Sequence, residues 1–452
     1  MLTYREALTA IFRRTDYERG DRPPYAERVW RLGRMEELLA QLGNPHRAYR
    51  SVHIAGTKGK GSTTAMIESI LRAAGYKTGM YTSPHLHTFR ERIQIEGRLI
   101  SEEEVSELME SMVPLLEARP EVTVFEIMTA LAMWLYARRE VDFGVFEVGL
   151  GGRLDSTNVL QPEVAVITSI SLDHMNVLGN TLSAIAREKA GIIKTGTPVV
   201  TSPQKAEAMA VIEATTAERQ APLTAVGRDW QWRFLGADLQ GQRLAVYRAS
   251  QADAPEYPEL FLPLLGRHQL ENACTALAAI EVLRERGIFI PATAIREGLA
   301  QTRWPGRMEV LGQGPLVMVD GAHNSDSMQR LLEALPEYLN YRRILALFGA
   351  GQTHDYAGML ALLAPQVDGL YACQAPHPKA TPTETIAEAA ERHGGKVLGR
   401  GSVGEMLDAA LAEAGPDDLV LITGSLFVVA EARRAWFAAR GVTLPADPPG
   451  VY

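Results

Sequence analysis

A glycine-rich segment with two lysines and two hydroxyl side chains follows an apolar run near the N-terminus; it reads Gly56-Thr57-Lys58-Gly59-Lys60-Gly61-Ser62-Thr63. A strand, such a loop and then a helix form the arrangement that binds nucleotide phosphates through backbone N–H groups and the helix N-terminus. Lys60 would reach the outer phosphates, and Ser62 or Thr63 would meet Mg²⁺. The fit to the general pattern is imperfect because Gly61 separates Lys60 from Ser62. The segment predicts a phosphate site, and the alternative is an ordinary glycine-rich turn.

Further polar side chains follow apolar runs elsewhere in the chain. Glu147 comes directly after the run 143–146 and precedes a glycine-rich stretch, and His174 follows the run 164–170. Ligands of open parallel sheets bind outside the carboxyl ends of the strands, so both side chains should face the crevice that contains the loop. A carboxylate suits Mg²⁺, whereas imidazole is an unusual ligand for this ion. From spacing alone His174 is more often a structural residue, and Lys189 reads as a solvated helix residue.

The last third of the chain shows a similar pattern. Asp320 and His323 follow the apolar run 316–319, which is compatible with a second polar site at a strand end. Arg307 lies in the stretch between the two halves of the chain, from which it could reach a phosphate in the first half. The alternative for Arg307 is an ion pair between domains, and the sequence leaves both interpretations open.

The composition is that of an ordinary globular protein of 452 residues, with 46% hydrophobic and 22% charged residues. A formal charge of −8 argues against a nucleic acid or an anionic membrane as the main partner. Cys274 and Cys373 have no metal-like spacing and fit a reducing compartment. The N-terminus carries no apolar signal region, and the most apolar segment, 419–430, is too short to span a bilayer. We therefore expect a cytoplasmic protein.

Short apolar runs that alternate with helical patterns predict α/β architecture with parallel sheets. In the first half we expect strands at 52–55, 143–148, 164–170 and 198–202, then an antiparallel hairpin at a sheet edge (230–248) and a helix (269–286). Pro and Gly within 301–306 mark the expected domain boundary. Beyond it we expect a second series of strands at 316–320, 344–349, 369–373 and 419–423.

Taken together, these segments resemble the Mur ligase superfamily, and within it the folylpolyglutamate synthase/dihydrofolate synthase family. The matching segments are 56–62, Tyr81-Thr82-Ser83-Pro84-His85-Leu86, Phe125-Glu126, 147–155, 171–174, Gly266-Arg267-His268-Gln269-Leu270-Glu271-Asn272, Pro305-Gly306-Arg307-Met308-Glu309 and 320–324. They occur in order over nearly the whole chain, which is more specific than any single motif. One departure is Lys58, where many relatives carry asparagine; it affects only the phosphate contact expected from that residue.

The resemblance implies an N-terminal P-loop ATPase-type domain over residues 1–300 and a smaller Rossmann-like α/β domain over residues 301–452. It also implies ATP-dependent amide-bond formation between the carboxylate of dihydropteroate or a reduced folate and the amino group of L-glutamate, through an acyl phosphate. The expected cofactors are ATP and two Mg²⁺ ions. We expect a monomer with small-molecule substrates and with no nucleic acid or membrane partner.

The same resemblance assigns roles residue by residue. The catalytic set is Lys60, Glu147, His174, Lys189 and Arg307. ATP contacts are expected from Gly56, Thr57, Lys58, Gly59, Lys60, Gly61, Ser62, Thr63, Asn272, Arg307, Asp320 and His323. The expected Mg²⁺ ligands are Ser83, Glu147 and His174, joined by Lys189 if its amine is carbamylated. The pterin pocket is expected at Thr123, Val124, Phe125, Glu126, Leu154, Asp155 and Ser156.

Two alternatives stay open at this point. The first is another ligase of the superfamily that acts on a cell-wall nucleotide precursor; the Gly-Lys-Gly-Ser loop ending and the Thr-Ser-Pro-His-Leu segment favour the folate branch instead. The second is a nucleotide-binding switch that ligates nothing. A second α/β domain and the lack of an evident guanine-reading Asn-Lys-x-Asp segment argue against a switch. The sequence does not distinguish dihydropteroate from a folate as the acceptor.

Overall fold

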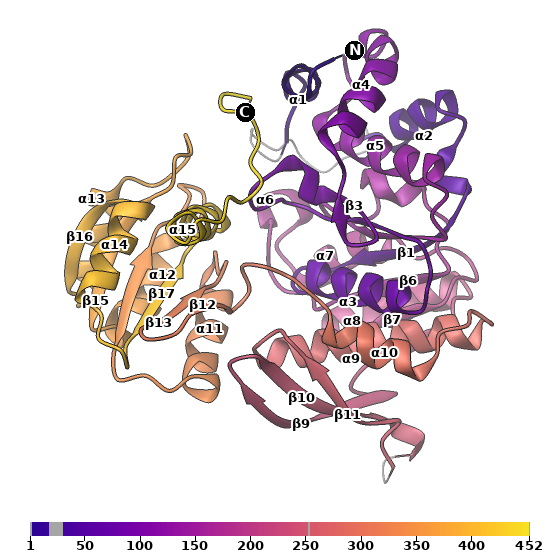
Figure 1. Cartoon of the computed structure of the whole chain (residues 1–452). Helices are drawn as coiled ribbons and strands as arrows, with labels where there is room; N and C mark the ends of the chain where they lie inside the picture. The colour runs from indigo at the N-terminus through magenta and orange to yellow at the C-terminus, as the bar shows by residue number, and fades with distance from the viewer. Residues whose placement is uncertain (1, 18–29, 252–253, 452) are drawn as a thin grey trace.

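The computed structural model describes residues 2–17, 30–251 and 254–451. In it the chain folds into two lobes of unequal size (Figure 1). The larger lobe contains an eight-stranded sheet and a three-stranded sheet, and the smaller lobe contains a six-stranded sheet. The chain passes from one lobe to the other between α10 (Ala292–Ala300) and β12 (Glu309–Gly312). The boundary expected at 301–306 lies in this connection.

The eight-stranded sheet has the strand order β4-β3-β2-β5-β1-β6-β7-β8. Six of these strands run parallel, namely β2, β5, β1, β6, β7 and β8. The remaining two, β3 and β4, form an antiparallel edge. The central strands are buried on both faces, which explains their continuous apolar runs. The bounds are β1 (Arg50–Ala55), β2 (Thr78–Tyr81), β3 (Ile93–Ile95), β4 (Arg98–Leu99), β5 (Phe143–Glu147), β6 (Val164–Ile167), β7 (Val199–Thr201) and β8 (Leu223–Ala225).

Helices cover both faces of this sheet (Figure 1). One apolar core joins β1 to α3, α9 and α10, and two further cores join the opposite face to α5 and to α7 and α8. α1, α2 and α4 pack outside α5. The bounds are α1 (Tyr4–Phe12), α2 (Leu32–Gln41), α3 (Lys60–Ala73), α4 (Glu102–Glu117), α5 (Val124–Arg138), α6 (Met175–Leu178), α7 (Leu182–Ala190), α8 (Ala206–Glu218) and α9 (Arg267–Glu285).

The antiparallel hairpin forms where the sequence predicts it, as β9 (Trp230–Asp238) and β10 (Gly241–Arg248). The sequence predicts that this hairpin lies at the edge of the large sheet, and that part of the prediction is wrong. Instead it pairs with β11 (Tyr257–Leu262) in a separate three-stranded sheet, and β8 forms the edge of the large one. The physical reason is burial, because β10 and β11 place apolar side chains in the core beside α9.

The smaller lobe is a six-stranded sheet of order β12-β13-β17-β14-β15-β16, parallel except for β12. The strands predicted in this half form within one residue of the expected bounds. The strand bounds are β13 (Leu316–Val319), β14 (Ile344–Phe348), β15 (Gly369–Gln374), β16 (Val397–Ser402) and β17 (Leu419–Thr423). The helices are α11 (Ser325–Tyr338), α12 (Tyr356–Leu363), α13 (Thr383–Arg392), α14 (Val403–Glu413) and α15 (Leu426–Ala438).

After α15 the chain returns to the larger lobe. The C-terminal segment runs beside α1 (Figure 1), and Val451 is buried in the core that α1 shares with α4 and α5. The division into 1–300 and 301–452 does not anticipate this return, because no apolar pattern in so short a tail indicates its partner.

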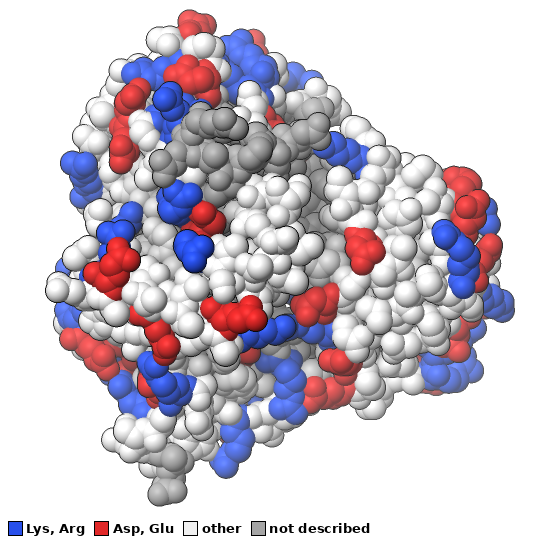
Figure 2. Space-filling view, turned by 180° about the vertical axis from the view of Figure 1, so that it is seen from behind, with Lys and Arg blue, Asp and Glu red and all other residues white. Residues whose placement is uncertain are grey.

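Charged side chains of both signs are interspersed on the face drawn in Figure 2, without one broad basic field. Within the described ranges, no helix has the length and apolar character needed to cross a membrane. Both cysteines are buried and unlinked.

Candidate functional site

The glycine loop lies directly after β1, and its glycines allow close contact with two other parts of the chain. Gly59 has a positive φ of 87° and caps α3, which begins at Lys60 inside the motif rather than after it. A Cβ on Gly59 would lie 2.2 Å from Asn272 Oδ1, and one on Gly61 would lie 2.3 Å from the Trp304 ring. The loop is therefore enclosed by α9 and by the connection between the lobes.

The residues that follow β6 hold the start of this loop. The N–H groups of Thr57 and Lys58 both donate to the Ser169 carbonyl (2.9 and 3.1 Å), and the Thr57 hydroxyl exchanges hydrogen bonds with the backbone of Ser171 (3.2 Å each). These contacts explain why β6 ends at Ile167, three residues earlier than predicted.

The first turn of α3 supplies free donors for an anion. Thr63 N–H donates to Gly59 O (2.9 Å), so the N–H groups of Lys60, Gly61 and Ser62 precede the first bond of the helix. These N–H groups and the helix dipole favour a phosphate. The Thr63 hydroxyl is buried and has no hydrogen-bond partner among the residues that the structure describes, which leaves it available to a ligand.

Lys60 meets a buried carboxylate at the end of β5. Lys60 Nζ lies 3.7 Å from Glu147 Oε1, and Ser83 N–H donates to Glu147 Oε2 (3.3 Å). Burial raises the pKa of Glu147, and the Lys60 ammonium opposes that shift. The structure thus brings together three predicted site residues from three separate segments.

Lys189 is buried beside the loop, although the sequence by itself indicates a solvated residue. It lies on α7, and its Nζ donates to the Gly56 carbonyl (2.7 Å). Burial lowers the pKa of Lys189 to about 7, and the nearby Lys60 adds to the shift. A large share of this amine is therefore neutral near pH 7.

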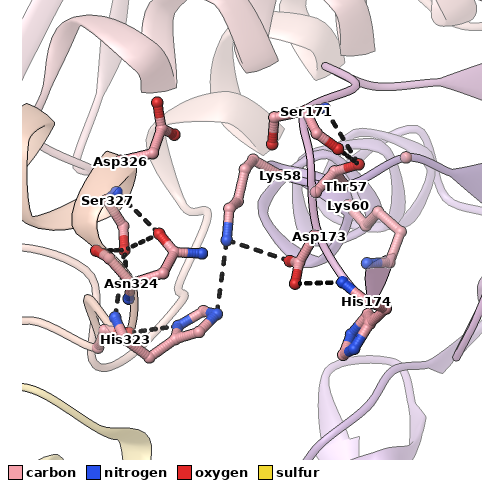
Figure 3. A network of polar contacts seen from close by, with 12 residues as sticks. Thr57, Lys58, Lys60, Ser171, Asp173, His174, His323, Asn324, Asp326 and Ser327 are labelled. Atoms are coloured by element: carbon pink, nitrogen blue, oxygen red, sulfur yellow. Dashed lines mark hydrogen bonds and ion pairs between the residues drawn. The ribbon is translucent and has the colours of Figure 1, made fainter. Parts of the chain in front are cut away.

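A polar network crosses from one lobe to the other (Figure 3). Lys58 Nζ lies 3.4 Å from Asp173 Oδ2 in the larger lobe and 3.5 Å from His323 Nε2 in the smaller lobe. His323 Nδ1 lies 3.0 Å from the Gly321 carbonyl, so Nδ1 carries the proton and Nε2 accepts from the ammonium. Burial lowers the pKa of Lys58, with Asp173 opposing the shift.

Arg307 and Asp320 lie at the same boundary. Asp320 is buried and accepts from Met308 N–H (2.9 Å) and Ala322 N–H (2.8 Å). Burial raises the pKa of Asp320, and Arg307 lowers it; Arg307 also lowers the pKa of Glu147. The guanidinium therefore acts on carboxylates of both lobes.

The predicted metal ligands are only partly assembled. Ser83 and Glu147 are neighbours, whereas His174 is exposed at the start of α6. In the part of the chain that the structure describes, no three His, Cys, Asp or Glu side chains converge on a possible metal position. A buried carboxylate with a hydroxyl residue beside it is nevertheless a donor pair that suits Mg²⁺.

In the predicted pterin pocket, several side chains already have partners. Glu126 accepts from the Thr123 N–H (2.8 Å) and hydroxyl (2.9 Å) in a capping box at the start of α5, and Arg34 pairs with its other oxygen (3.0 Å). Val124 is buried in the core. Phe125 is half-buried, and a Cβ on Gly149 would lie 2.4 Å from its ring.

In the second predicted segment of this pocket, residues 154–156, the acidic side chain also has hydrogen-bond partners already. Asp155 is buried and accepts from the N–H groups of Leu150 (2.9 Å) and Thr157 (3.0 Å). Burial raises the pKa of Asp155. Leu154 and Ser156 on either side are half-buried.

Sequence reasoning missed several polar groups at the carboxyl edge of the second sheet. The hydroxyls of Thr381 and Thr423 and the Nδ1 atom of His354 are buried without hydrogen-bond partners in the described part of the chain. Thr423 ends an apolar run, so the rule that identified Asp320 would also have found it. Trp304 lies in the stretch 301–306 that the sequence indicates only as a domain boundary, and its ring covers Gly61.

Known proteins match both lobes of the chain. Residues 54–280 match the Mur ligase middle domain, and residues 306–426 match the Mur ligase glutamate ligase domain. The chain is 38% identical to a Bacillus subtilis protein named dihydrofolate synthase/folylpolyglutamate synthase, over 89% of this chain and 94% of that protein. It is 40% identical, over 88% of its residues, to a Halobacterium salinarum protein named probable bifunctional folylpolyglutamate synthase/dihydropteroate synthase, of which it spans about half the length (49%).

A solved structure shares the complete fold. The Escherichia coli protein FolC, described in complex with DHPP and ADP, superposes with a TM-score of 0.82 at 31% identity, covering 97% of this chain and 99% of that one. Both lobes and the connection between them are therefore common to the two proteins. With these matches, the chain belongs to the folylpolyglutamate synthase/dihydrofolate synthase family of Mur ligases.

Proposed function

We propose that this protein is an ATP-dependent ligase that joins L-glutamate to the carboxylate of dihydropteroate, of a reduced folate, or of both. The observation that carries the proposal is the Lys58–His323 contact, which sets the phosphate loop of one lobe against the carboxyl edge of the other. One cleft is thereby lined by an anion site and by a second set of polar groups. The relative described with DHPP and ADP supports this pair of ligands.

Activation of the acceptor carboxylate is the first step, because a carboxylate is a poor acyl donor. The ATP phosphates lie at the N-terminus of α3, where free N–H groups and the helix dipole face the anion. Lys60 turns from Glu147 to the outer phosphate, and Arg307 adds positive charge from the connection between lobes. The carboxylate then attacks the γ-phosphorus and displaces ADP, leaving an acyl phosphate.

Mg²⁺ belongs to this proposal through the family resemblance and the donors present. Glu147 and Ser83 would hold the ion, and bound Mg²⁺ supplies charge neutralisation at the transferred phosphoryl group. Lys189 is suited to carbamylation, since its pKa of about 7 leaves neutral amine to react with carbon dioxide. The modification replaces a buried cation with oxygen donors. His174 is included as a ligand on the family resemblance alone.

L-glutamate binds at the carboxyl edge of the six-stranded sheet. The loops after β14 and β15 and the end of β17 contribute the His354 Nδ1 atom and the hydroxyls of Thr381 and Thr423, which are buried and have no hydrogen-bond partner among the described residues. Thr381 N–H donates to Ala350 O (2.8 Å), which places the loop after β15 against the loop after β14. Such unpartnered groups are costly unless a ligand satisfies them, and an amino acid brings both donors and acceptors.

The second step is attack of the glutamate amine on the acyl phosphate. His323 Nε2 is an acceptor within the cleft, and Lys58 and Arg307 supply positive charge on either side of it. The tetrahedral intermediate then loses phosphate to give the amide. Trp304 and Arg307 line the connection between the lobes, so closing the lobes on the ligands would exclude water from the acyl phosphate.

The pterin end of the acceptor lies near Phe125 and the segment 154–156. Phe125 is the half-buried member of its segment and packs on Gly149, in the glycine stretch that follows Glu147. An aromatic face of this kind is suited to stacking on a planar pterin ring. Glu126 and Asp155 then act by fixing the backbone on which these side chains stand.

Phosphate release from ATP, measured with Mg²⁺ and glutamate, tests the proposal. The three arms contain dihydropteroate, a reduced folate monoglutamate, or no acceptor. Release with dihydropteroate alone identifies a dihydrofolate synthase, release with folate alone identifies a chain-extending synthase, and release with both identifies the bifunctional enzyme. Acceptor-independent release, or no release in any arm, would contradict the proposal.

The same assay addresses the two alternatives. A nucleotide-binding switch would hydrolyse ATP slowly and without dependence on glutamate. A ligase of cell-wall precursors would respond to a nucleotide-linked peptide acceptor and not to a pterin. The identity to relatives named as folate ligases over most of the chain favours the pterin acceptor.

A further inference from the structure

The loop between β2 and β3 (residues 82–92) carries Ser83 beside Glu147 and is braced from within. Thr82 N–H donates to the Arg92 carbonyl (3.1 Å), which closes the base of the loop. Inside it, the Glu91 carboxylate accepts three backbone N–H groups, from Leu86 (2.6 Å), His87 (2.8 Å) and Thr88 (3.2 Å). A loop closed at its base and braced in this way moves largely as one unit. Contacts at its far end therefore influence where Ser83 lies.

The smaller lobe holds that far end. Arg433 on α15 contacts the His87 ring and pairs with Glu309 on β12 (2.8 Å). Asp447, in the tail after α15, accepts from Thr88 Oγ1 (2.6 Å) and from Phe89 N–H (2.6 Å). These hydrogen bonds join a loop of the nucleotide-binding lobe to the last residues of the chain.

The tail itself is fixed on the larger lobe at Asp447 and at residues that follow it. Tyr4 OH donates to the same carboxylate (2.6 Å), and the Arg5 guanidinium donates to the Pro449 carbonyl (2.9 Å). Val451 lies buried in the core beside α1. Three short bonds to one carboxylate, with an apolar anchor four residues later, describe a docked segment rather than a loose end.

We propose that Asp447 is a positioning residue that acts through loop 82–92 to keep Ser83 beside Glu147. The tail of the smaller lobe thereby completes the nucleotide end of the cleft in the larger lobe. Only the kinetic consequence rests on the proposed function, because the contacts exist in the chain without any ligand. Removing the carboxylate deprives Phe89 N–H and the Thr88 hydroxyl of a charged acceptor and frees one side of the loop.

Hydrogen exchange in the full chain, without nucleotide, tests the contact directly. Asp447→Ala should raise exchange in a peptide that covers 82–92 by roughly tenfold, since losing hydrogen bonds to a charged group lowers the free energy of opening. Thr443→Ala changes an exposed residue of the same tail and should stay within about twofold of the unmodified chain. Unchanged exchange in the Asp447→Ala variant would overturn the proposal.

Steady-state kinetics of the same variants measures the consequence for the site. The KM for MgATP should rise about fivefold in Asp447→Ala, with kcat within about twofold, because a positioning defect weakens binding more than chemistry. Asp447→Asn keeps the volume of the side chain and should give an intermediate value. Tyr4→Phe removes one donor but leaves the carboxylate on the loop and should behave like the unmodified chain.

The two readouts separate the possible failures. Faster exchange with an unchanged KM would overturn the positioning role. A loss of kcat as large as the rise in KM would also contradict it. Unmodified protein without ligase activity would reject the proposed function, while the exchange experiment would still decide whether Asp447 holds the loop.

Discussion

The carboxyl edges of the two main sheets present chemically different surfaces to one cleft. At the edge of the eight-stranded sheet the charged groups are already paired within the chain, Lys60 with Glu147 and Lys58 with Asp173. At the edge of the six-stranded sheet, neutral polar atoms of Thr381 and Thr423 are buried without partners. The charged groups of the first edge must exchange internal partners for a ligand, whereas the unpartnered hydroxyls, including that of Thr63 at the first edge, gain bonds that they lack.

This difference separates two ways to prepare a binding site. The internal ion pair holds Lys60 and Glu147 in place before a phosphate arrives, but each residue is then a partner with which the ligand must compete. Unpartnered hydroxyls cost stability in the empty site, and a ligand recovers that cost on binding. We therefore expect substitutions at the first edge to affect catalysis strongly and those at the second edge to affect glutamate binding.

Lys60→Ala should produce the largest effect. Without its ammonium, the loop retains its N–H groups but loses the charge at the transferred phosphoryl group, and turnover should fall by about 10³-fold or more. Acceptor-dependent ADP formation is the measurement, and Lys205→Ala, an exposed lysine of the same lobe, is the matched control. Turnover equal to that of the unmodified enzyme would remove the first edge from the mechanism.

Lys189 provides a pH-dependent test of the first edge. Its folded pKa of about 7 lies below the unfolded value near 10.5, so between these values the unfolded chain binds a proton that the folded chain does not. Stability contributed by this residue should therefore rise with pH above about 7, by up to about 1.4 kcal/mol per pH unit.

The comparison is between unmodified protein and Lys189→Met, unfolded in urea from pH 7 to 9 in buffer free of carbon dioxide. The free energy of unfolding of unmodified protein should increase relative to that of the variant over this window. Parallel pH profiles would mean that Lys189 keeps its proton in the folded chain.

The hydroxyls of the second edge should show a smaller and more selective effect. Thr381→Val and Thr423→Val keep the side-chain shape and remove groups that have no partner in the empty chain. The KM for glutamate should rise about five- to tenfold, with the KM for ATP unchanged, and the free energy of unfolding should be unchanged or higher. A marked loss of stability in either variant would show that its hydroxyl is satisfied in the empty chain and would remove the contrast.

The smallest effect on catalysis is expected from Glu126 in the predicted pterin pocket. Glu126→Gln weakens a capping box and the pair with Arg34, so it should cost about 1 kcal/mol of stability and change the acceptor KM less than about threefold. Phe125→Ala should raise the acceptor KM about tenfold, through loss of the stacking face. A larger rise in the acceptor KM for Glu126→Gln than for Phe125→Ala would assign Glu126 to direct contact with the acceptor.

How much of the molecule could be predicted depends on how far apart the interacting residues lie in the sequence. Four strands of each main sheet, the helix 269–286 and the phosphate loop follow from local patterns, because strand periodicity and glycine chemistry act within a few residues. Lys189 could not be predicted as buried, since its partner Gly56 is 133 residues away. Asp447 and Tyr4 are 443 residues apart, and no periodicity connects them.

The candidate site residues, too, could be predicted only where the signal lies within a few residues of the sequence. Glu147 and Asp320 were predicted because each follows a buried strand, and the structure places both at a carboxyl edge. Thr123 and Glu126 match a functional segment of the family, yet the same spacing forms a helix cap, and sequence alone does not separate the two roles. Thr423 could have been predicted in the same way because it ends a strand, whereas Thr381 lies in a loop and looks like any other threonine until its neighbours are known.

The central claim is that ATP activates the acceptor carboxylate in the cleft between these two edges. Dihydropteroate or a folate monoglutamate labelled with ¹⁸O in the reacting carboxylate, incubated with ATP, Mg²⁺ and glutamate, tests it most directly. An acyl phosphate predicts one ¹⁸O atom in the phosphate released per turnover. Phosphate released without the label, at the same rate as product, would contradict carboxylate activation by phosphoryl transfer.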